Sequence, residues 1–381
     1  MLRLRAAAAV TLVVTGVACR PAAPAEFRVG LIGVFEGTMA FSSGEPARDG
    51  ARLAVDELNA AGGIAIGGRR HRVVLIERES APRPDAAAIA ARALINLDSV
   101  DVIVGPQTSA LAIAAGAVAE AAEVPMIAPM ASNPQVTEQR RFVSRLAFRD
   151  EVQGAALAAF AFDSLGVRRA AALHEVASAY GRDITRLFAE TFTARGGQMV
   201  AVETFASDGP RDHTPEIRRI LATHPDAILM PSFVVHDSAQ IRIARGLGFR
   251  GVFLGSDAWD VITLQRREDA VGSVVSANWD RRIDRPALRR FVRAWEARYT
   301  ERPRATGAAT YDAIHLLAEA AESSGSRGGG ALADSLRRPR EWEGAFSRYR
   351  WVGTGDPVRG AVLLEIGRDS FIVRATQDPP P

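Results

Sequence analysis

Short apolar runs alternate with segments of helical periodicity over most of the chain. Residues 27–34 form a nearly continuous apolar run, which is typical of a parallel strand buried on both faces of its sheet. The next segment, 46–60, carries apolar residues at helical spacing, and Gly62 and Gly63 then favour a left-handed helix end. This succession of strand and helix predicts an α/β fold with parallel sheets.

The same strand-and-helix unit repeats in two successive series. The predicted strands are 73–77, 100–104, 125–128, 170–174, 199–205, 227–230 and 252–254, and the predicted helices are 85–97, 109–123, 151–165, 181–195, 215–223 and 238–247. A chain of 381 residues is too long for one ordinary hydrophobic core. We therefore predict two similar α/β lobes.

The alternation ends near residue 275. Two long helices are predicted at 286–299 and 307–323, followed by a surface loop at 323–330. Residues 346–373 predict two or three antiparallel strands, and residues 377–381 a tail. The C-terminal part therefore adds elements to the two lobes and does not form a third.

The N-terminus predicts export from the cell. Arg3 and Arg5 precede the apolar run 6–14, which is too short to span a bilayer, and small residues follow it. We interpret residues 1–18 as a signal peptide, and we expect a periplasmic or cell-surface location in a bacterium.

Cys19 is the only cysteine in the chain, so the mature protein has no internal disulfide. Its position after Ala18 resembles the lipobox of bacterial lipoproteins, which implies a lipid anchor on Cys19 and a tether over 19–26. The alternative is an incidental cysteine after an ordinary signal peptide, because Gly16 stands where lipoproteins usually have leucine.

Composition excludes several classes of function. Every basic residue is arginine, so Schiff-base and phosphate-loop lysines are absent. The arginines are spread along the chain and the net charge is only +3, so we expect no nucleic-acid partner. The six histidines lack metal-ligand spacing, and we expect neither a metal nor a cofactor.

A series of short motifs carries a family resemblance over residues 27–375. The segments are Gly33–Gly37, Gly50–Asn59, Gly62–Ile64, Val104–Pro106 with Ser109, Ala128–Pro134, Tyr180–Gly181, Gly255–Asp257 and Tyr311–Ala313. Their order and spacing resemble the branched-chain amino-acid-binding family, the leucine/isoleucine/valine-type receptors that serve ABC transporters. The resemblance implies the type I periplasmic binding protein fold, in which two Rossmann-like lobes are joined by three crossing strands.

The resemblance also implies that each lobe is discontinuous in sequence. We place the crossings near residues 147, 279 and 342. Lobe 1 would then contain 27–147 and 280–341, and lobe 2 would contain 148–279 and 342–376.

Ser109 and Ser132 each follow a predicted strand at the edge where open α/β sheets bind ligands. Their hydroxyl groups and nearby amide N–H groups favour an anion, because helix N-termini have unpaired donors. The alternative is that both serines only cap helices. The family match favours binding of a ligand carboxylate by these two turns, and Met130 lies in the same turn as Ser132.

Further residues are assigned to the ligand site by the resemblance. In amino-acid-binding relatives an acidic residue at the position of Asp257 holds the α-ammonium group; the alternative is a solvated turn aspartate. Tyr180 matches a tyrosine that lines the pocket, and Phe233 occupies a turn where relatives often have tyrosine. Phe41 and Trp259 are candidate pocket walls that could equally be local core. An apolar, aromatic-lined pocket would suit branched or aromatic side chains.

Binding followed by hinge closure is therefore the expected function. The expected partners are a small amino acid or related carboxylate, an ABC permease and the membrane, and we expect a monomer. One rival is a sensor of the same fold that binds an amide, urea or aromatic carboxylate. The other is a Rossmann-like enzyme, but the chain has no Gly-x-Gly-x-x-Gly after its first strand, no Gly-x-Ser-x-Gly and no His-Glu-x-x-His.

Overall fold

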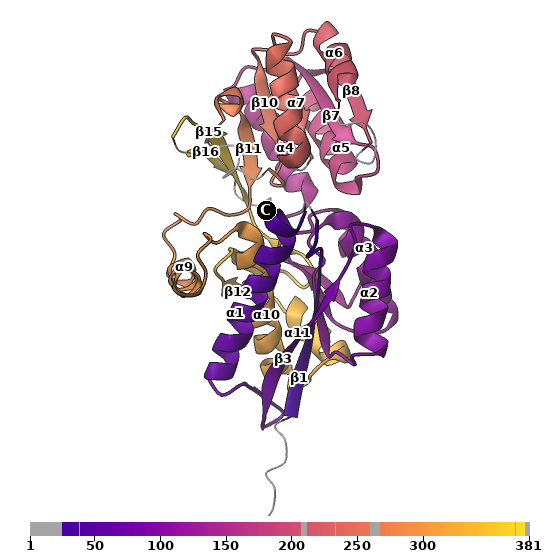
Figure 1. Cartoon of the computed structure of the whole chain (residues 1–381), viewed down its shortest axis with the longest axis vertical. Coiled ribbons are helices and arrows are strands. Elements are labelled where there is room, and N and C mark those ends of the chain that lie inside the picture. The colour runs from indigo at the N-terminus through magenta and orange to yellow at the C-terminus, as the bar shows by residue number, and fades with distance from the viewer. Residues whose placement is uncertain are drawn as a thin grey trace, which may run out of the picture.

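Two lobes are stacked along the long axis of the molecule in the computed structural model (Figure 1). The structure describes residues 25–37, 39–206, 212–232, 234–259, 267–369 and 371–377. The predicted signal peptide, Cys19, most of its tether, Phe233 and the residues after 377 lie outside the described residues.

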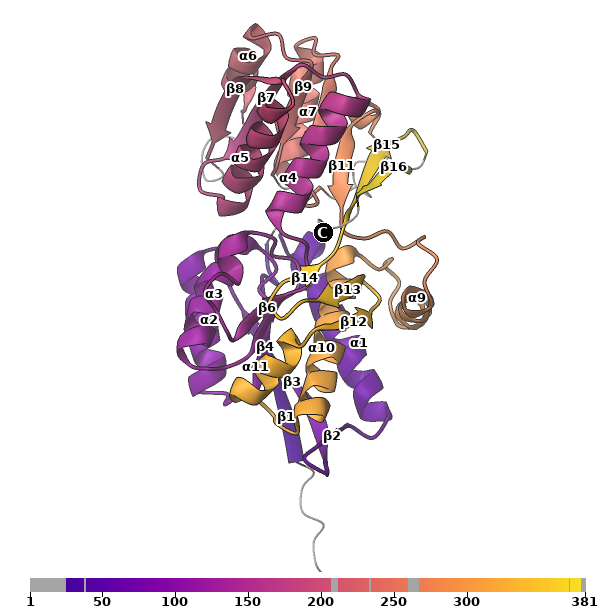
Figure 2. The same cartoon turned by 180° about the vertical axis from the view of Figure 1, so that it is seen from behind.

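Lobe 1 is built on a six-stranded sheet in the order β2-β3-β1-β4-β5-β6, parallel except for the β2–β3 hairpin. Its strands are β1 (Ala25–Gly33), β2 (Ile64–Ile66), β3 (Arg69–Glu79), β4 (Val102–Val104), β5 (Met126–Ala128) and β6 (Val143–Arg145). Its helices are α1 (Glu45–Ala60), α2 (Pro84–Asn96), α3 (Ser109–Ala121), α9 (Pro286–Arg298), α10 (Ala305–Ser324) and α11 (Gly329–Arg337), with short turns at Ala40–Gly44 and Pro134–Val136. Helices α1 and α10 cover one face of the sheet, and α2 and α3 cover the other (Figures 1 and 2).

Lobe 2 is built on a seven-stranded sheet in the order β16-β15-β11-β10-β9-β7-β8. Its strands are β7 (Arg169–Glu175), β8 (Gln198–Phe205), β9 (Ala227–Met230), β10 (Val252–Gly255), β11 (Val274–Ala277), β15 (Ala361–Ile366) and β16 (Phe371–Gln377). Its helices are α4 (Asp150–Ala159), α5 (Ala179–Ala194), α6 (Thr214–Ala222) and α7 (Val234–Gly246), with short turns at Phe160–Ser164 and Glu268–Ala270. The strands β7 to β11 are parallel, and β15 and β16 extend the sheet in antiparallel fashion.

A third, small sheet shows that the third crossing was placed wrongly. Strands β12 (Arg340–Glu343), β13 (Arg348–Trp351) and β14 (Pro357–Val358) are antiparallel and belong to neither large sheet. The buried rings of Phe346, Tyr349 and Trp351 pack into the core cluster of lobe 1. Residues 342–358 therefore belong with lobe 1, and the third crossing lies between β14 and β15.

Asp312 explains why this segment stays on lobe 1. Its buried carboxylate, on α10, accepts hydrogen bonds from the N–H groups of Ala345 and Phe346 at 2.7 and 2.8 Å and from the Tyr349 hydroxyl at 2.9 Å. Antiparallel strands were expected here from sequence, but local patterning does not reveal which lobe buries their aromatic face.

Arg359 joins the three passages between the lobes. It lies on the third passage and donates to the carbonyl oxygens of Leu146, on the first passage, at 3.0 Å and of Asn278, on the second, at 2.7 Å. Its guanidinium is buried, and this burial lowers its pKa to about 10. Arg359 therefore links all three passages at the waist between the lobes.

Candidate functional site

The serine turns lie together at the carboxyl ends of adjacent strands of lobe 1. Ser109 is the first residue of α3, after β4, and Ser132 follows β5. The Ser109 hydroxyl accepts a hydrogen bond from the backbone N–H of Asn133 at 3.3 Å, and both serines are buried. The turn after β4 requires glycine at position 105, because its φ is 86° and a Cβ there would collide with the Ile32 carbonyl oxygen. The two predicted anion-binding turns thus form one unit.

Tyr180 and Asp257 come together on lobe 2. Tyr180 lies in the first turn of α5, whose start is fixed by the Ser178 hydroxyl accepting from the Gly181 N–H at 3.0 Å. The Tyr180 hydroxyl donates to Asp257 Oδ1 at 2.6 Å, and the Asn278 amide donates to Oδ2. These two donors are neutral, and the nearest cationic influence on Asp257 is the charge of Arg359, which lowers the pKa of Asp257 against the effect of burial.

Two further buried residues, which sequence analysis missed, connect the serine turns to Asp257. Asp150 is fully buried at the start of α4, and its N–H donates to the Ser132 carbonyl at 3.0 Å. Gln153 donates to Asp150 Oδ1 at 3.1 Å and accepts from the Asp257 N–H at 3.3 Å. The available signal was a carboxylate directly before a predicted helix and close to a predicted crossing, where both lobes meet.

Burial controls the electrostatics of both carboxylates. It raises the pKa of Asp150 to about 7, with the charge of Asp257 contributing in the same direction, while the Ser132 and Gln153 hydrogen bonds and Arg145 oppose the shift. Burial also raises the pKa of Asp257 against its hydrogen bond from Tyr180. The site therefore holds two desolvated carboxylates whose ionised forms would gain from a cationic ligand.

We expect the Asp150→Asn variant to show a pH-dependent gain in stability. The pKa of Asp150 is raised from 3.8 to about 7 in the folded state, so the folded protein binds this proton more tightly than the unfolded chain does. The resulting contribution to the free energy of unfolding is complete below pH 4 and is lost as the pH rises through 7. At about 1.4 kcal/mol per pKa unit, ligand-free wild type should lose on the order of 2–4 kcal/mol relative to the variant between pH 4 and pH 8. Urea unfolding of both chains at the two pH values measures this change. If the difference in unfolding free energy between the two chains is the same at both pH values, the pKa of Asp150 is not raised.

The remaining predicted site residues have different surroundings. Met130 is half-buried against the lobe 1 core, next to the serine turn. Phe41 is 55% exposed, and its ring lies 4.3 Å from the Arg304 guanidinium. Trp259 is only 3% exposed, packs in the lobe 2 core and donates from its indole N–H to the Met230 carbonyl at 2.9 Å. We therefore assign Trp259 to the core rather than to the cleft.

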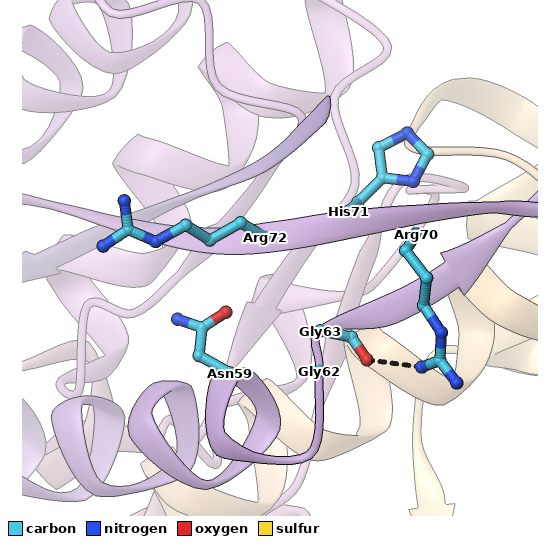
Figure 3. Close-up of a pocket in the computed structure, with 6 residues that line it drawn as sticks. All are labelled: Asn59, Gly62, Gly63, Arg70, His71 and Arg72. Carbon is cyan, nitrogen blue, oxygen red and sulfur yellow. Dashed lines mark hydrogen bonds between the residues drawn. The ribbon is translucent and has the colours of Figure 1, made fainter. Parts of the chain in front are cut away.

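A surface hollow lies at the opposite end of lobe 1 from the serine turns, beside the β2–β3 hairpin (Figure 3). Its groups already serve the fold, because Asn59 exchanges hydrogen bonds with the Val73 backbone and Arg70 donates to the Gly63 carbonyl at 2.8 Å. We assign no ligand to this hollow. In the described part of the chain, no three potential ligands gather to hold a metal, and no helix has the length and apolar character needed to cross a bilayer.

Two α/β lobes joined by three passages, with polar groups converging between them, form the architecture of a solute-binding protein. Residues 26–370 match the model of the periplasmic binding protein family, so the chain belongs to that family. This confirms the type I periplasmic binding protein fold and the family expected from the sequence motifs.

Relatives cover nearly the whole chain. The Leu/Ile/Val-binding protein BraC3 of Rhizobium johnstonii is 27% identical over 351 residues, which cover 90% of this chain and 92% of the relative. The crystal structure of the leucine-binding protein LivK from Thermotoga maritima is 29% identical, with a TM-score of 0.85 over 92% of this chain and 99% of that one. A solute-binding protein of an ABC transporter from Rhodopseudomonas palustris, solved with 3,4-dihydroxybenzoic acid, is 25% identical, with a TM-score of 0.81 over 93% of this chain and 98% of that one.

Proposed function

We propose that this chain is an exported solute-binding protein that captures a free amino acid with an apolar side chain for an ABC permease. The observation that carries the proposal is Asp257, a buried carboxylate with only neutral donors on its oxygens among the described residues. A buried carboxylate is stabilised by a cation, and the α-ammonium group of an amino acid supplies one. A lipid on Cys19 would keep the protein at the membrane.

The serine turns complement Asp257. A free amino acid carries a carboxylate and an ammonium group on one carbon, so its receptor needs anion donors close to an acidic group. Ser109 and Ser132 supply hydroxyl groups at the start of α3 and after β5. A series of hydrogen bonds runs from Ser132 through Asp150 and Gln153 to Asp257, and it joins the serine turns to the carboxylate. The carboxylate of the ligand would bind the serine turns and its ammonium group would bind Asp257.

Hinge closure follows from the division of these groups between the lobes. The serine turns belong to lobe 1, while Tyr180 and Asp257 belong to lobe 2. The ligand would dock on lobe 1, and lobe 2 would then rotate about the waist at Arg359 to bring Tyr180 and Asp257 onto it. A ligand favours the closed state by the contacts that it makes only there.

The names and bound ligands of the relatives support this ligand class and one alternative to it. Two of them are named for leucine or for leucine, isoleucine and valine, and the Rhodopseudomonas palustris protein was solved with an aromatic acid that has no ammonium group. An aromatic carboxylate would bring no cation to Asp257 beyond the charge of Arg359, so the buried carboxylate favours the amino acid.

Isothermal titration tests the proposal. The chain, lacking its signal peptide, is unfolded and refolded to remove bound ligand, and is then titrated with L-leucine, L-isoleucine, L-valine, L-phenylalanine and 3,4-dihydroxybenzoate. We expect micromolar or tighter binding of at least one amino acid. Binding of 3,4-dihydroxybenzoate alone would overturn the amino-acid assignment. Uptake of labelled ligand by cells with and without the gene separates transport from sensing.

A further inference from the structure

Asn133 makes a direct connection between the two lobes. It follows Ser132 on lobe 1 and is fully buried. Its side-chain NH₂ group donates to Asp183 on α5 of lobe 2 and to the Ala179 carbonyl, at 3.4 Å, at the start of the same helix. This contact is therefore adjacent to two predicted site residues, because Asn133 follows Ser132 directly and Ala179 precedes Tyr180 directly.

The orientation of the Asn133 amide is fixed within lobe 1. Its Oδ1 accepts from the Gln135 N–H at 3.0 Å and caps the short helical turn Pro134–Val136. With the oxygen engaged, both N–H donors are directed at lobe 2. Asp183 is itself held by Arg186, whose Nη2 lies 3.4 Å from Asp183 Oδ1. The donor and the acceptor are thus each prepared by their own lobe.

We propose that the Asn133–Asp183 pair is a clasp that stabilises the closed lobes and thereby sets the affinity for ligand without touching it. Hinge opening separates these two side chains, because they lie on different lobes beside the groups that receive the ligand. Hydrogen bonds to charged groups are stronger than neutral ones, so this contact biases the open–closed equilibrium toward closure. Asn133 and Asp183 are positioning residues of the proposed binding function, on which this inference rests.

The Asn133→Asp substitution isolates the clasp. Aspartate caps a helical turn as well as asparagine does, so the contact with Gln135 is retained. The new carboxylate, however, faces Asp183 and repels it. We expect L-leucine affinity to fall about 10- to 100-fold, mainly through faster dissociation. Small-angle X-ray scattering of the ligand-free variant should show a larger radius of gyration than that of the ligand-free parent.

The double variant Asn133→Asp/Asp183→Asn restores the hydrogen bond in the opposite direction, because the new amide at position 183 donates to the new carboxylate at position 133. It should recover most of the affinity and the smaller ligand-free radius. Asp163→Asn is the control for the second substitution, because it removes the same charge from an exposed position on lobe 2 and should behave as the parent does.

Two outcomes overturn the clasp. One is an Asn133→Asp variant whose ligand-free radius equals that of the parent, and the other is a double variant that is no more compact than the single one. Both are measured without ligand. If the parent binds none of L-leucine, L-isoleucine, L-valine and L-phenylalanine, the proposed ligand class fails while the scattering comparison still decides the clasp.

Discussion

The Asp257→Asn variant is expected to bind L-leucine at least about 100-fold more weakly than the parent chain. The substitution keeps the size of the side chain and an oxygen that can accept from Tyr180, but it removes the charge that we propose binds the ligand ammonium group. Truncating one partner of a buried charge pair costs about 2–5 kcal/mol, which corresponds to this loss. Titration calorimetry on both chains measures it.

The unfolding temperature of the ligand-free variant distinguishes a loss of ligand binding from a loss of folding. Burial raises the pKa of Asp257, so removing its charge should leave the ligand-free unfolding temperature unchanged or higher. Asp163→Asn is a suitable control, because it removes the same charge from an exposed ion pair with Arg195 on lobe 2 and should leave affinity unchanged. Unaltered leucine binding in Asp257→Asn would remove Asp257 from the site.

The Asp356→Ala variant is expected to lose about 3–5 kcal/mol of unfolding free energy. Arg145 is 0% exposed, and Asp356 is its ion-pair partner at 2.6 Å. Asp356 lies between β13 and β14, so the pair fastens the small sheet to β6 of lobe 1. Removing the carboxylate leaves a buried guanidinium without its counter-charge. Urea unfolding of ligand-free protein measures the loss.

An exposed pair on the same lobe provides the control. Arg141 and Asp334 are each more than half exposed, and Asp334→Ala should cost less than about 1 kcal/mol. The double variant Arg145→Met/Asp356→Leu should recover stability relative to Asp356→Ala, because it no longer buries an uncompensated charge. Equal losses in Asp356→Ala and Asp334→Ala would show that the buried pair does not hold the small sheet.

Periodicity predicted the large sheets because their strands are apolar runs buried on both faces. The run 27–34 corresponds to β1 and the run 227–230 to β9. Short strands with little apolar pattern, such as β6 and β12, were missed. The segment 342–358 was assigned to the wrong lobe. Its attachment depends on the hydrogen bonds of Ala345 to Asp312 and of Thr137 to Asp356, and each of these bonds joins residues that are distant in the sequence.

The positions of the candidate site residues were predictable where a polar residue follows a strand. Ser109, Ser132 and Asp257 stand at such positions, and the carboxyl ends of parallel strands meet at one edge of each sheet. Asp150, Gln153 and Asn133 were not identified, because their importance arises only when the two lobes meet. The Trp259 ring is a further example, since its burial beside Gly255 is a property of the folded lobe.

A titration with matched pairs of ligands shows whether Asp257 binds an ammonium group. Each of L-leucine, L-isoleucine, L-valine and L-phenylalanine is compared with the carboxylic acid that has the same skeleton without the amino group, as 4-methylpentanoate is to leucine. Asp257 as the ammonium receptor predicts that the best-bound amino acid binds at least about 100-fold more tightly than its deaminated partner. Equal or tighter binding of the deaminated acid would show that Asp257 does not bind the ammonium group of the ligand.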